Sequence, residues 1–153
     1  MSRLLLSLGH NASAILVKDG CVVAGYEEER LTKLKSDSSF PRCAIEQLKH
    51  VHPKTFSDIG DVYISHWFTD GVLPEIHDKY FDPLYFDFNM PGVKVHSVSM
   101  EFTHHDAHAW SGLAFAGDQF PKNNAYVIVA DGFGNFGETM SVYLIESYGT
   151  PTL

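Results

Sequence analysis

Two histidines and one aspartate in the second half of the chain could together hold a metal ion. His104 and His108 are four residues apart, so both rings share one face if this segment is helical. Imidazoles one turn apart can chelate one divalent cation. The start of a helix disfavours positive charge, so we expect neutral rings, the form that binds metal. Asp131 would add a carboxylate and leave open positions for water or substrate. The alternatives are a polar helix edge for the histidines and a turn with Gly132 for Asp131.

The segments around these residues predict a helix and a strand. Thr103 followed by Asp106 is typical of a helix N-cap with a capping-box acid, so the helix should begin directly after Thr103, with Asp106 pointing towards its start. The third histidine, His105, could share the metal-binding face at its edge. The apolar run 125–130 predicts a buried strand that ends at Asp131.

Composition indicates a globular chain with a real core. It has 153 residues, of which 44% are hydrophobic and 20% charged. The formal charge of −8 argues against nucleic acid and anionic membranes as partners. No apolar run approaches the ~20 residues that span a bilayer. Cys21 and Cys43 form no CxxC pair, and the apolar start is too short for a secretory signal, so we expect a reducing, cytoplasmic setting.

The chain predicts three antiparallel strands followed by alternating helices and strands. Strands are expected at 3–8, 12–17, 21–26, 62–64, 93–98, 125–130 and 139–146. Asp19-Gly20 predicts a hairpin turn. The charged run 27–35 is expected to be mostly a solvated loop. A helix should start at Pro41 and place Ala44, Ile45, Leu48 and Val51 on its apolar face.

This order of elements is the layout of a ribonuclease-H-like α/β domain with a mixed sheet. Residues 67–92, rich in proline and aromatic residues, form an excursion from it, with a short helix at 73–80. We expect the excursion to pack its aromatics onto the domain or a partner, with a substrate lid as the alternative. We further expect residues 1–124 to form one lobe and residues 125–153 to open an incomplete second lobe.

Several segments together resemble the N-terminal half of the NodU/CmcH carbamoyltransferase family. They are Gly9-His10-Asn11-Ala12-Ser13-Ala14, Asp19-Gly20, Glu27-Glu28-Glu29-Arg30-Leu31-Thr32, Ser38-Ser39-Phe40-Pro41-Arg42 with Ala44-Ile45, and His104-His105-Asp106-Ala107-His108-Ala109. They come in the family's order and cover nearly all of the chain except 67–92. The family is similar in its first domain to the tRNA threonylcarbamoyl-adenosine modification proteins. The resemblance therefore implies the actin-like ATPase superfamily, in which two ribonuclease-H-like lobes close over a nucleotide.

The resemblance implies carbamoyl transfer. In this family a YrdC-like domain makes carbamoyl-adenylate from carbamoyl phosphate and ATP. The first domain then moves the carbamoyl group to a hydroxyl of a small molecule. The resemblance also implies a divalent metal held by His104, His108 and Asp131, with iron as the first choice and zinc or manganese as alternatives.

Further residues expected to serve this chemistry lie in turns and charged loops. The candidate nucleotide and phosphate contacts are Gly9, Asn11, Lys35, Arg42, Gly132 and Gly134. His10 is the candidate catalytic donor or general base, and one of Glu27, Glu28 and Glu29 could orient the acceptor. For His10, Lys35 and Arg42 the alternative is an ordinary loop residue.

Length is where the chain departs from the family, whose members are several times longer. We expect the rest of the second lobe, a further metal-binding aspartate and the adenylate-forming domain to come from elsewhere. The chain would then be a piece of an enzyme, with a second chain or a homo-oligomer as partner and little transfer alone. The exposed edge of the last hairpin favours self-association. Two other functions stay open. One is magnesium-dependent phosphotransfer or nuclease chemistry, disfavoured because the first strand carries no aspartate; the other is a non-enzymatic binding or assembly module.

Overall fold

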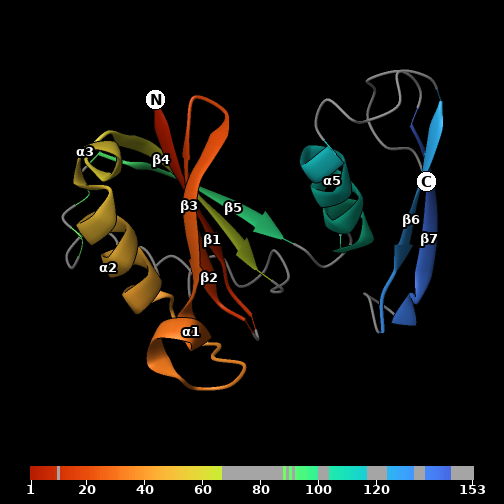
Figure 1. The fold of residues 1–153 in the computed structure, drawn as a ribbon, viewed down its shortest axis with the longest axis horizontal. Coiled ribbons are helices and arrows are strands. Elements are labelled where there is room, and N and C mark those ends of the chain that lie inside the picture. Colours follow the sequence, from red (N-terminus) through yellow and green to blue (C-terminus); the bar gives the residue numbers. More distant parts are fainter. Residues whose placement is uncertain are drawn as a thin grey trace. The chain divides into compact units, whose positions relative to one another are not determined.

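The computed structural model describes residues 1–9, 11–66, 88, 90, 92–99, 104–116, 124–132 and 137–145. The chain forms two compact units, Met1–Ser99 and Met100–Leu153, which are drawn in Figure 1 and described separately below. The predicted helix at 73–80 and the predicted N-cap Thr103 lie outside the described residues. None of the described helices is both long and apolar enough to cross a membrane.

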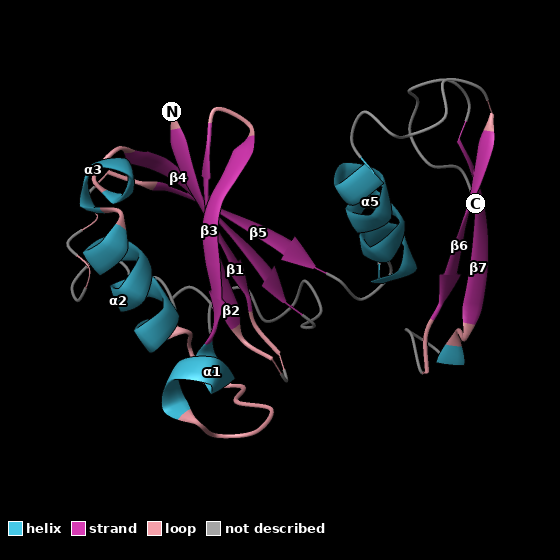
Figure 2. Ribbon diagram, viewed as in Figure 1, coloured by secondary structure: helices cyan, strands magenta, loops and turns pink. Residues whose placement is uncertain are grey.

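Unit 1 is built on a five-stranded mixed sheet of order β3-β2-β1-β4-β5 (Figure 2). Its strands are β1 (Ser2–Ser7), β2 (Ser13–Lys18), β3 (Cys21–Glu27), β4 (Ile59–His66) and β5 (Lys94–Ser99). β1 and β3 each pair antiparallel with β2, whereas β4 pairs parallel with both β1 and β5. The predicted fold class, an α/β domain with three antiparallel strands leading into a parallel crossover, is therefore confirmed.

The hairpin between β2 and β3 follows its predicted turn chemistry. Asp19 and Gly20 both have positive φ, 51° and 84°, as the two central residues of a type I′ turn require. The Asp19 carboxylate also pairs with the N-terminal ammonium group at 2.7 Å. The turn thereby fixes the register between Lys18 and Cys21.

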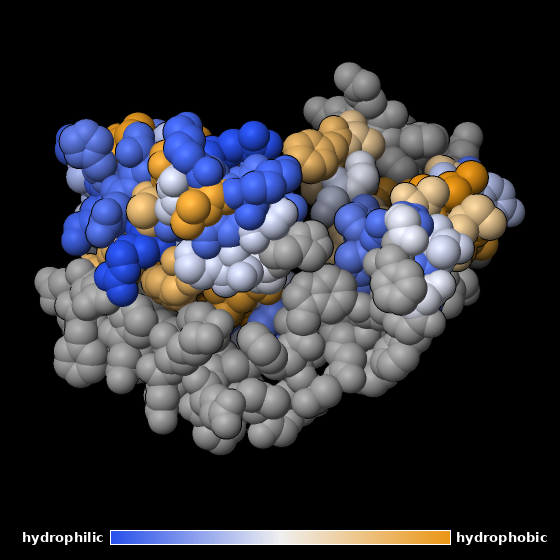
Figure 3. All heavy atoms as spheres, turned by 90° about the horizontal axis from the view of Figure 1, so that it is seen from below, coloured by the Kyte–Doolittle hydropathy of each residue, from blue (hydrophilic) through white to orange (hydrophobic). Residues whose placement is uncertain are grey.

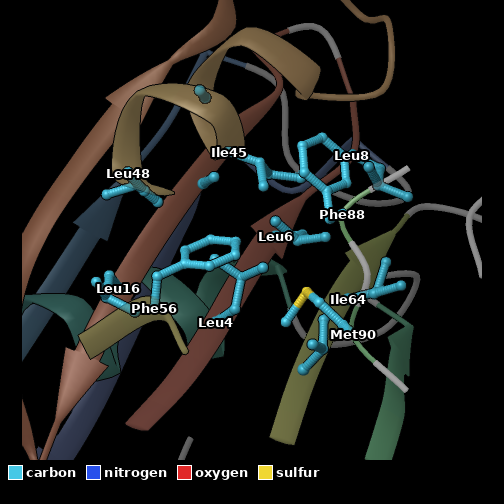
Figure 4. Close-up of a cluster of buried hydrophobic side chains, with 13 residues drawn as sticks. Leu4, Leu6, Leu8, Leu16, Ile45, Leu48, Phe56, Ile64, Phe88 and Met90 are labelled. Atoms are coloured by element: carbon cyan, nitrogen blue, oxygen red, sulfur yellow. The ribbon is translucent and has the colours of Figure 1, made fainter. Parts of the chain in front are cut away.

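The core of unit 1 lies between the sheet and the helices α2 (Arg42–Val51) and α3 (Pro53–Phe56). The described surface of this unit is mostly hydrophilic in the view of Figure 3. The buried residues labelled in Figure 4 are Leu4, Leu6, Leu8, Leu16, Ile45, Leu48, Phe56, Ile64, Phe88 and Met90. Phe88 and Met90 come from the excursion, so these two residues do pack onto the domain. Val51, predicted on the apolar face of α2, is 44% exposed because it is the last helical residue.

The charged run after β3 is solvated at most of its charges, as predicted, because Glu27, Arg30, Lys33 and Lys35 are exposed, but it is not a plain loop, and Glu28 and Glu29 are buried. It contains the helix α1 (Glu28–Thr32), and the Glu28 side chain is only 2% exposed. The Glu28 carboxylate accepts the backbone N–H groups of Cys43 at 2.9 Å and Ala44 at 2.8 Å. These amides begin α2, so charge-assisted hydrogen bonds and the helix dipole replace the water that the carboxylate loses. The sequence pattern could not show this cap, because its partners lie 15 and 16 residues away.

Unit 2 consists of the helix α5 (His104–Ala116) and an antiparallel hairpin of β6 (Ala125–Ala130) and β7 (Met140–Ile145). Its core holds Ala109, Val129, Tyr143 and Ile145. The prediction of a buried β6 is wrong for one face, because Tyr126 is 73% and Ile128 67% exposed. The compact units divide after residue 99, so α5 groups with the hairpin. The proposed lobes, 1–124 and 125–153, stay a prediction.

Candidate metal centre

His104, His108 and Asp131 converge at the start of α5. His104 Nε2 lies 2.6 Å from Asp131 Oδ2 and 3.2 Å from His108 Nε2. His108 Nε2 lies 3.6 Å from the same carboxylate oxygen. The structure thus brings together the three residues that the sequence proposes as metal ligands. Their function as ligands stays a prediction.

Local geometry explains this convergence. α5 begins at His104, and the imidazole one turn later stacks edge-on against it, with ring centroids 4.6 Å apart. Asp131 directly follows β6, and its backbone N–H donates to the carbonyl of Thr139 at 3.1 Å. The Gly132 N–H donates to Asp131 Oδ1 at 2.6 Å. Asp131 Oδ2 is therefore the oxygen that faces the rings. The predicted phosphate contact of Gly132, whose N–H donates to Asp131 Oδ1, stays a prediction.

The spacing of the three donor atoms fits one cation. Protein nitrogen and oxygen ligands lie about 2.0–2.2 Å from zinc-sized metals, so two ligands are about 3.0 Å apart at a right angle and about 3.4 Å at a tetrahedral angle. The observed separations of 2.6, 3.2 and 3.6 Å bracket these values. The His104 side chain is 15% exposed, Asp131 32% and His108 52%. The centre is therefore open to solvent on the His108 side.

Electrostatics favour the ligating form of Asp131. The hydrogen bond from His104 is the largest influence that lowers the pKa of this carboxyl below its ordinary value, and the Gly132 N–H lowers it further. An ionised carboxylate beside two imidazoles has the charge that a divalent cation requires.

A fourth group, His105, lies beside these donors and was predicted only at the edge of the site. It is 2% exposed, and its Nδ1 lies 2.6 Å from Ser141 Oγ on β7. One of its ring nitrogens lies within 4.8 Å of the donor atoms of His104 and Asp131. Helical spacing alone favours His104 and His108 as the ligand pair. Only the packing of β7 against α5 shows that His105 lies beside them.

Asp106 contacts the hairpin. The Tyr143 hydroxyl donates to Asp106 Oδ1 at 2.8 Å. Burial, and then this hydrogen bond, raise the pKa of Tyr143 to about 12. The pair ties the first turn of α5 to β7, close to the histidines.

The other predicted site residues described in the structure belong to unit 1. Gly9 and Asn11 lie between β1 and β2. Lys35 is 88% exposed, with its Nζ 3.8 Å from a Glu29 oxygen. Arg42 opens α2, and its guanidinium lies 5.8 Å from the centroid of the Phe88 ring. Contact between these residues and a phosphate stays a prediction, and the predicted His10 and Gly134 lie outside the described residues.

The glutamates considered for acceptor binding have structural partners. Both Glu28 oxygens accept amides of α2, and Glu29 Oε2 accepts the Ser36 N–H at 2.8 Å. Glu27 pairs with Arg30 at 3.0 Å. The geometry of Glu28 in particular argues against a role in binding an acceptor, because its side chain is 2% exposed and both oxygens already accept amides of α2.

One hollow described in the structure lies in unit 1. It has a volume of about 440 Å³ and is lined mainly by apolar side chains such as Phe56, Phe88 and Met90, with Lys49 at its edge. Its described lining holds no pair of groups suited to acid–base or metal chemistry. We therefore place the candidate site at the histidines.

Comparison with solved structures gives distant likenesses. YeaZ from Pseudomonas aeruginosa aligns with a TM-score of 0.44 and 11% identity, over 95% of this chain and 66% of that one. The Ppx/GppA family member of Aquifex aeolicus aligns with a TM-score of 0.36 and 14% identity, over 96% of this chain and 51% of that one. These likenesses say nothing about activity.

Comparison with curated sequences gives one match over most of the chain. No family model matches the sequence. A 32-residue segment is 56% identical to the protein sll1178 of Synechocystis, covering 21% of this chain and 5% of that protein. Over 140 residues the chain is 27% identical to the nodulation protein NolNO of Sinorhizobium fredii, which covers 83% of this chain. The chain spans only 20% of the length of NolNO.

Proposed function

We propose that this chain is the metal-bearing portion of a carbamoyltransferase. The reaction would move a carbamoyl group from carbamoyl-adenylate, made from carbamoyl phosphate and ATP, to a hydroxyl of a small molecule. The observation that carries the proposal is the convergence of His104 Nε2, His108 Nε2 and Asp131 Oδ2 within 3.6 Å. The similarity to NolNO, a NodU-family protein, supports it along 83% of the chain.

Each side chain of the proposed centre has a separate role. A divalent cation, iron or else zinc or manganese, would polarise the carbamoyl carbonyl and offset phosphate charge. Asp131 supplies the compensating negative charge, and the Gly132 N–H holds its carboxylate in one orientation. The start of α5 positions both imidazoles, one helical turn apart. His108, which is half exposed, borders the side from which a substrate would enter.

We propose that carbamoyl-adenylate formation lies outside this chain, in a further segment or a partner chain. Carbamoyl-adenylate is an activated mixed anhydride that water destroys, so its transfer requires a second part that closes over the metal centre. The acceptor is a hydroxyl compound, and His10 is the proposed donor or general base.

Metal binding tests the proposal directly. The purified chain is loaded with Fe²⁺ under anaerobic conditions, or with Zn²⁺ or Mn²⁺, and its metal content and affinity are measured by mass spectrometry and calorimetry. We expect one ion per chain, and at least about 100-fold weaker binding in H104A/H108A, which lacks two ligands. His50→Ala is the matched control, because it removes an exposed helical histidine in unit 1.

The possible outcomes separate the candidate functions. Loss of metal in H104A/H108A but not in H50A supports the proposal. Full occupancy in the double variant overturns the ligand assignment. Binding of magnesium alone favours phosphotransfer, and binding of no metal favours a non-enzymatic module.

Transfer itself is tested by adding a co-encoded adenylate-forming protein, ATP, labelled carbamoyl phosphate and candidate hydroxyl acceptors. Transfer that depends on this chain and is lost in H104A/H108A is the expected result. An undiminished rate with the double variant would remove the metal centre from the reaction.

A further inference from the structure

His105 has an unusual environment for a core histidine. Its side chain is 2% exposed, and within the described part of the chain its Nε2 has no hydrogen-bond partner. Buried polar atoms in native proteins nearly always have a hydrogen-bond partner, so a buried ring nitrogen without one indicates that a ligand binds there. The neighbouring donor atoms, on His104 and Asp131, lie within 4.8 Å of a His105 ring nitrogen.

The other ring nitrogen of His105 shows which tautomer the site favours. Nδ1 lies 2.6 Å from Ser141 Oγ and 3.7 Å from Glu138 Oε2. A nearby carboxylate favours a proton on Nδ1, which then donates to the serine oxygen. Nε2 is left with a lone pair that no donor among the described residues satisfies. A ring whose Nδ1–H donates to an oxygen while Nε2 faces the metal is the usual arrangement of a metal-bound histidine.

From these contacts we propose that His105 Nε2 is a fourth ligand of the metal centre, with Ser141 and Glu138 as the groups that orient its ring. The proposal rests on the metal site of the proposed function and deepens it. Ligands of one such ion lie at most about 4.2 Å apart, which is close to the 4.8 Å within which the donor atoms of His104, His105 and Asp131 lie.

A fourth ligand has a consequence for metal choice. Three imidazoles and one carboxylate suit transition metals, whereas magnesium takes oxygen ligands. Four protein ligands would fill the tetrahedral shell that zinc prefers in structural sites. An open position for substrate then requires a five- or six-coordinate ion, so the fourth ligand favours iron or manganese over zinc.

Substitution by asparagine separates ligation from packing. In H105N the side-chain amide can still donate to Ser141 from the position of Nδ1, but nothing replaces Nε2. Glutamine in H105Q instead presents a polar atom near the position of Nε2. We expect H105N to fold, shown by an unchanged far-UV circular dichroism spectrum, and to bind Co²⁺ about 10- to 100-fold more weakly than wild type. H105Q should recover part of that loss.

The proton NMR spectrum of the Co²⁺-loaded chain also gives the number of histidine ligands without an activity assay. Each histidine bound through Nε2 shows one exchangeable, hyperfine-shifted Nδ1–H resonance in the proton NMR spectrum. We expect three such resonances in the wild-type chain and two in H105N. Two resonances in both, with equal Co²⁺ affinity, would overturn the role of His105 and leave the three-ligand site intact. Absence of Co²⁺ binding by the wild-type chain would instead overturn the metal centre itself. If H105N fails to fold, the wild-type and H105Q spectra still decide, because a wild-type spectrum with only two resonances overturns the proposal.

Discussion

Replacing the buried carboxylate of Glu28 should destabilise unit 1 by several kcal/mol. Its two oxygens accept the N–H groups of Cys43 and Ala44 at the start of α2. A hydrogen bond to a charged group contributes about 1.5–3 kcal/mol, and a carboxylate at a helix N-terminus adds about 0.3–1 kcal/mol. Glu28→Ala removes all of these, for a loss of about 3–7 kcal/mol, which approaches the whole stability of a small domain.

Glu28→Gln is the variant to measure. Glutamine has the same length but offers one oxygen, and its NH₂ group would face the second amide. We therefore expect a loss of about 2–3 kcal/mol in the free energy of unfolding. Urea unfolding followed by far-UV circular dichroism measures it. If local opening at α2 carries the loss, exchange of the Cys43 and Ala44 amide hydrogens should accelerate roughly 30- to 150-fold.

Glu46→Gln is the matched control for Glu28→Gln. Glu46 is an exposed glutamate on α2, so Glu46→Gln should change the free energy of unfolding by less than about 0.5 kcal/mol. If E28Q proves as stable as E46Q and keeps the same amide protection, the carboxylate does not cap α2. The burial of Glu28 would then need another explanation.

Three further predictions rest on perturbed pKa values. The Ser39 hydroxyl, bonded to Asp37, is the largest influence that lowers the pKa of that carboxyl below 3.8. The stability that the ionised Asp37 carboxylate contributes is complete above pH 3.8 and is lost as the pH falls through the folded pKa. In D37N the free energy of unfolding should therefore fall less steeply with decreasing pH at the acid end; an unchanged slope there would contradict this. Burial raises the pKa of Tyr143 from 10.0 to about 12. The stability tied to its neutral phenol is complete below pH 10 and lost between pH 10 and 12, and ultraviolet titration should find one tyrosine still neutral at about pH 11. The Glu28 carboxylate is the largest influence that raises the pKa of the Cys43 thiol, so iodoacetamide should alkylate Cys43 faster in E28Q at pH 8; equal rates by peptide mass spectrometry would contradict the cause.

Much of unit 1 could be predicted because its signals are local. The apolar residues 4–6 predict the first strand, and Asp19-Gly20 predicts the hairpin turn between the second and third strands. The α2 prediction failed only at Val51, where the helix ends. The prediction of solvated charges at 27–35 failed only at Glu28 and Glu29. Glutamates usually face water, and no local signal shows that the first amides of α2 bind Glu28.

In unit 2, the sequence of Ala125–Ala130 does not determine whether one or both faces of the strand are buried. A continuous apolar stretch is consistent with a strand buried on both faces. The structure packs α5 on one face and leaves Tyr126 and Ile128 exposed on the other. Apolar content alone cannot distinguish these cases, because the number of covering layers is a property of the fold.

The amino-acid sequence by itself determined that two imidazoles would share one face of a helix, because the pitch of a helix relates residues four apart without reference to the rest of the chain. It also determined the strands and their first turn. Only the tertiary structure decided that Asp131 would reach His104, 27 residues away, and that Ser141 would hold His105, 36 residues away. Contacts at such separations depend on how β6 and β7 pack against α5, and the free energy of that packing is spread over the whole core of the unit.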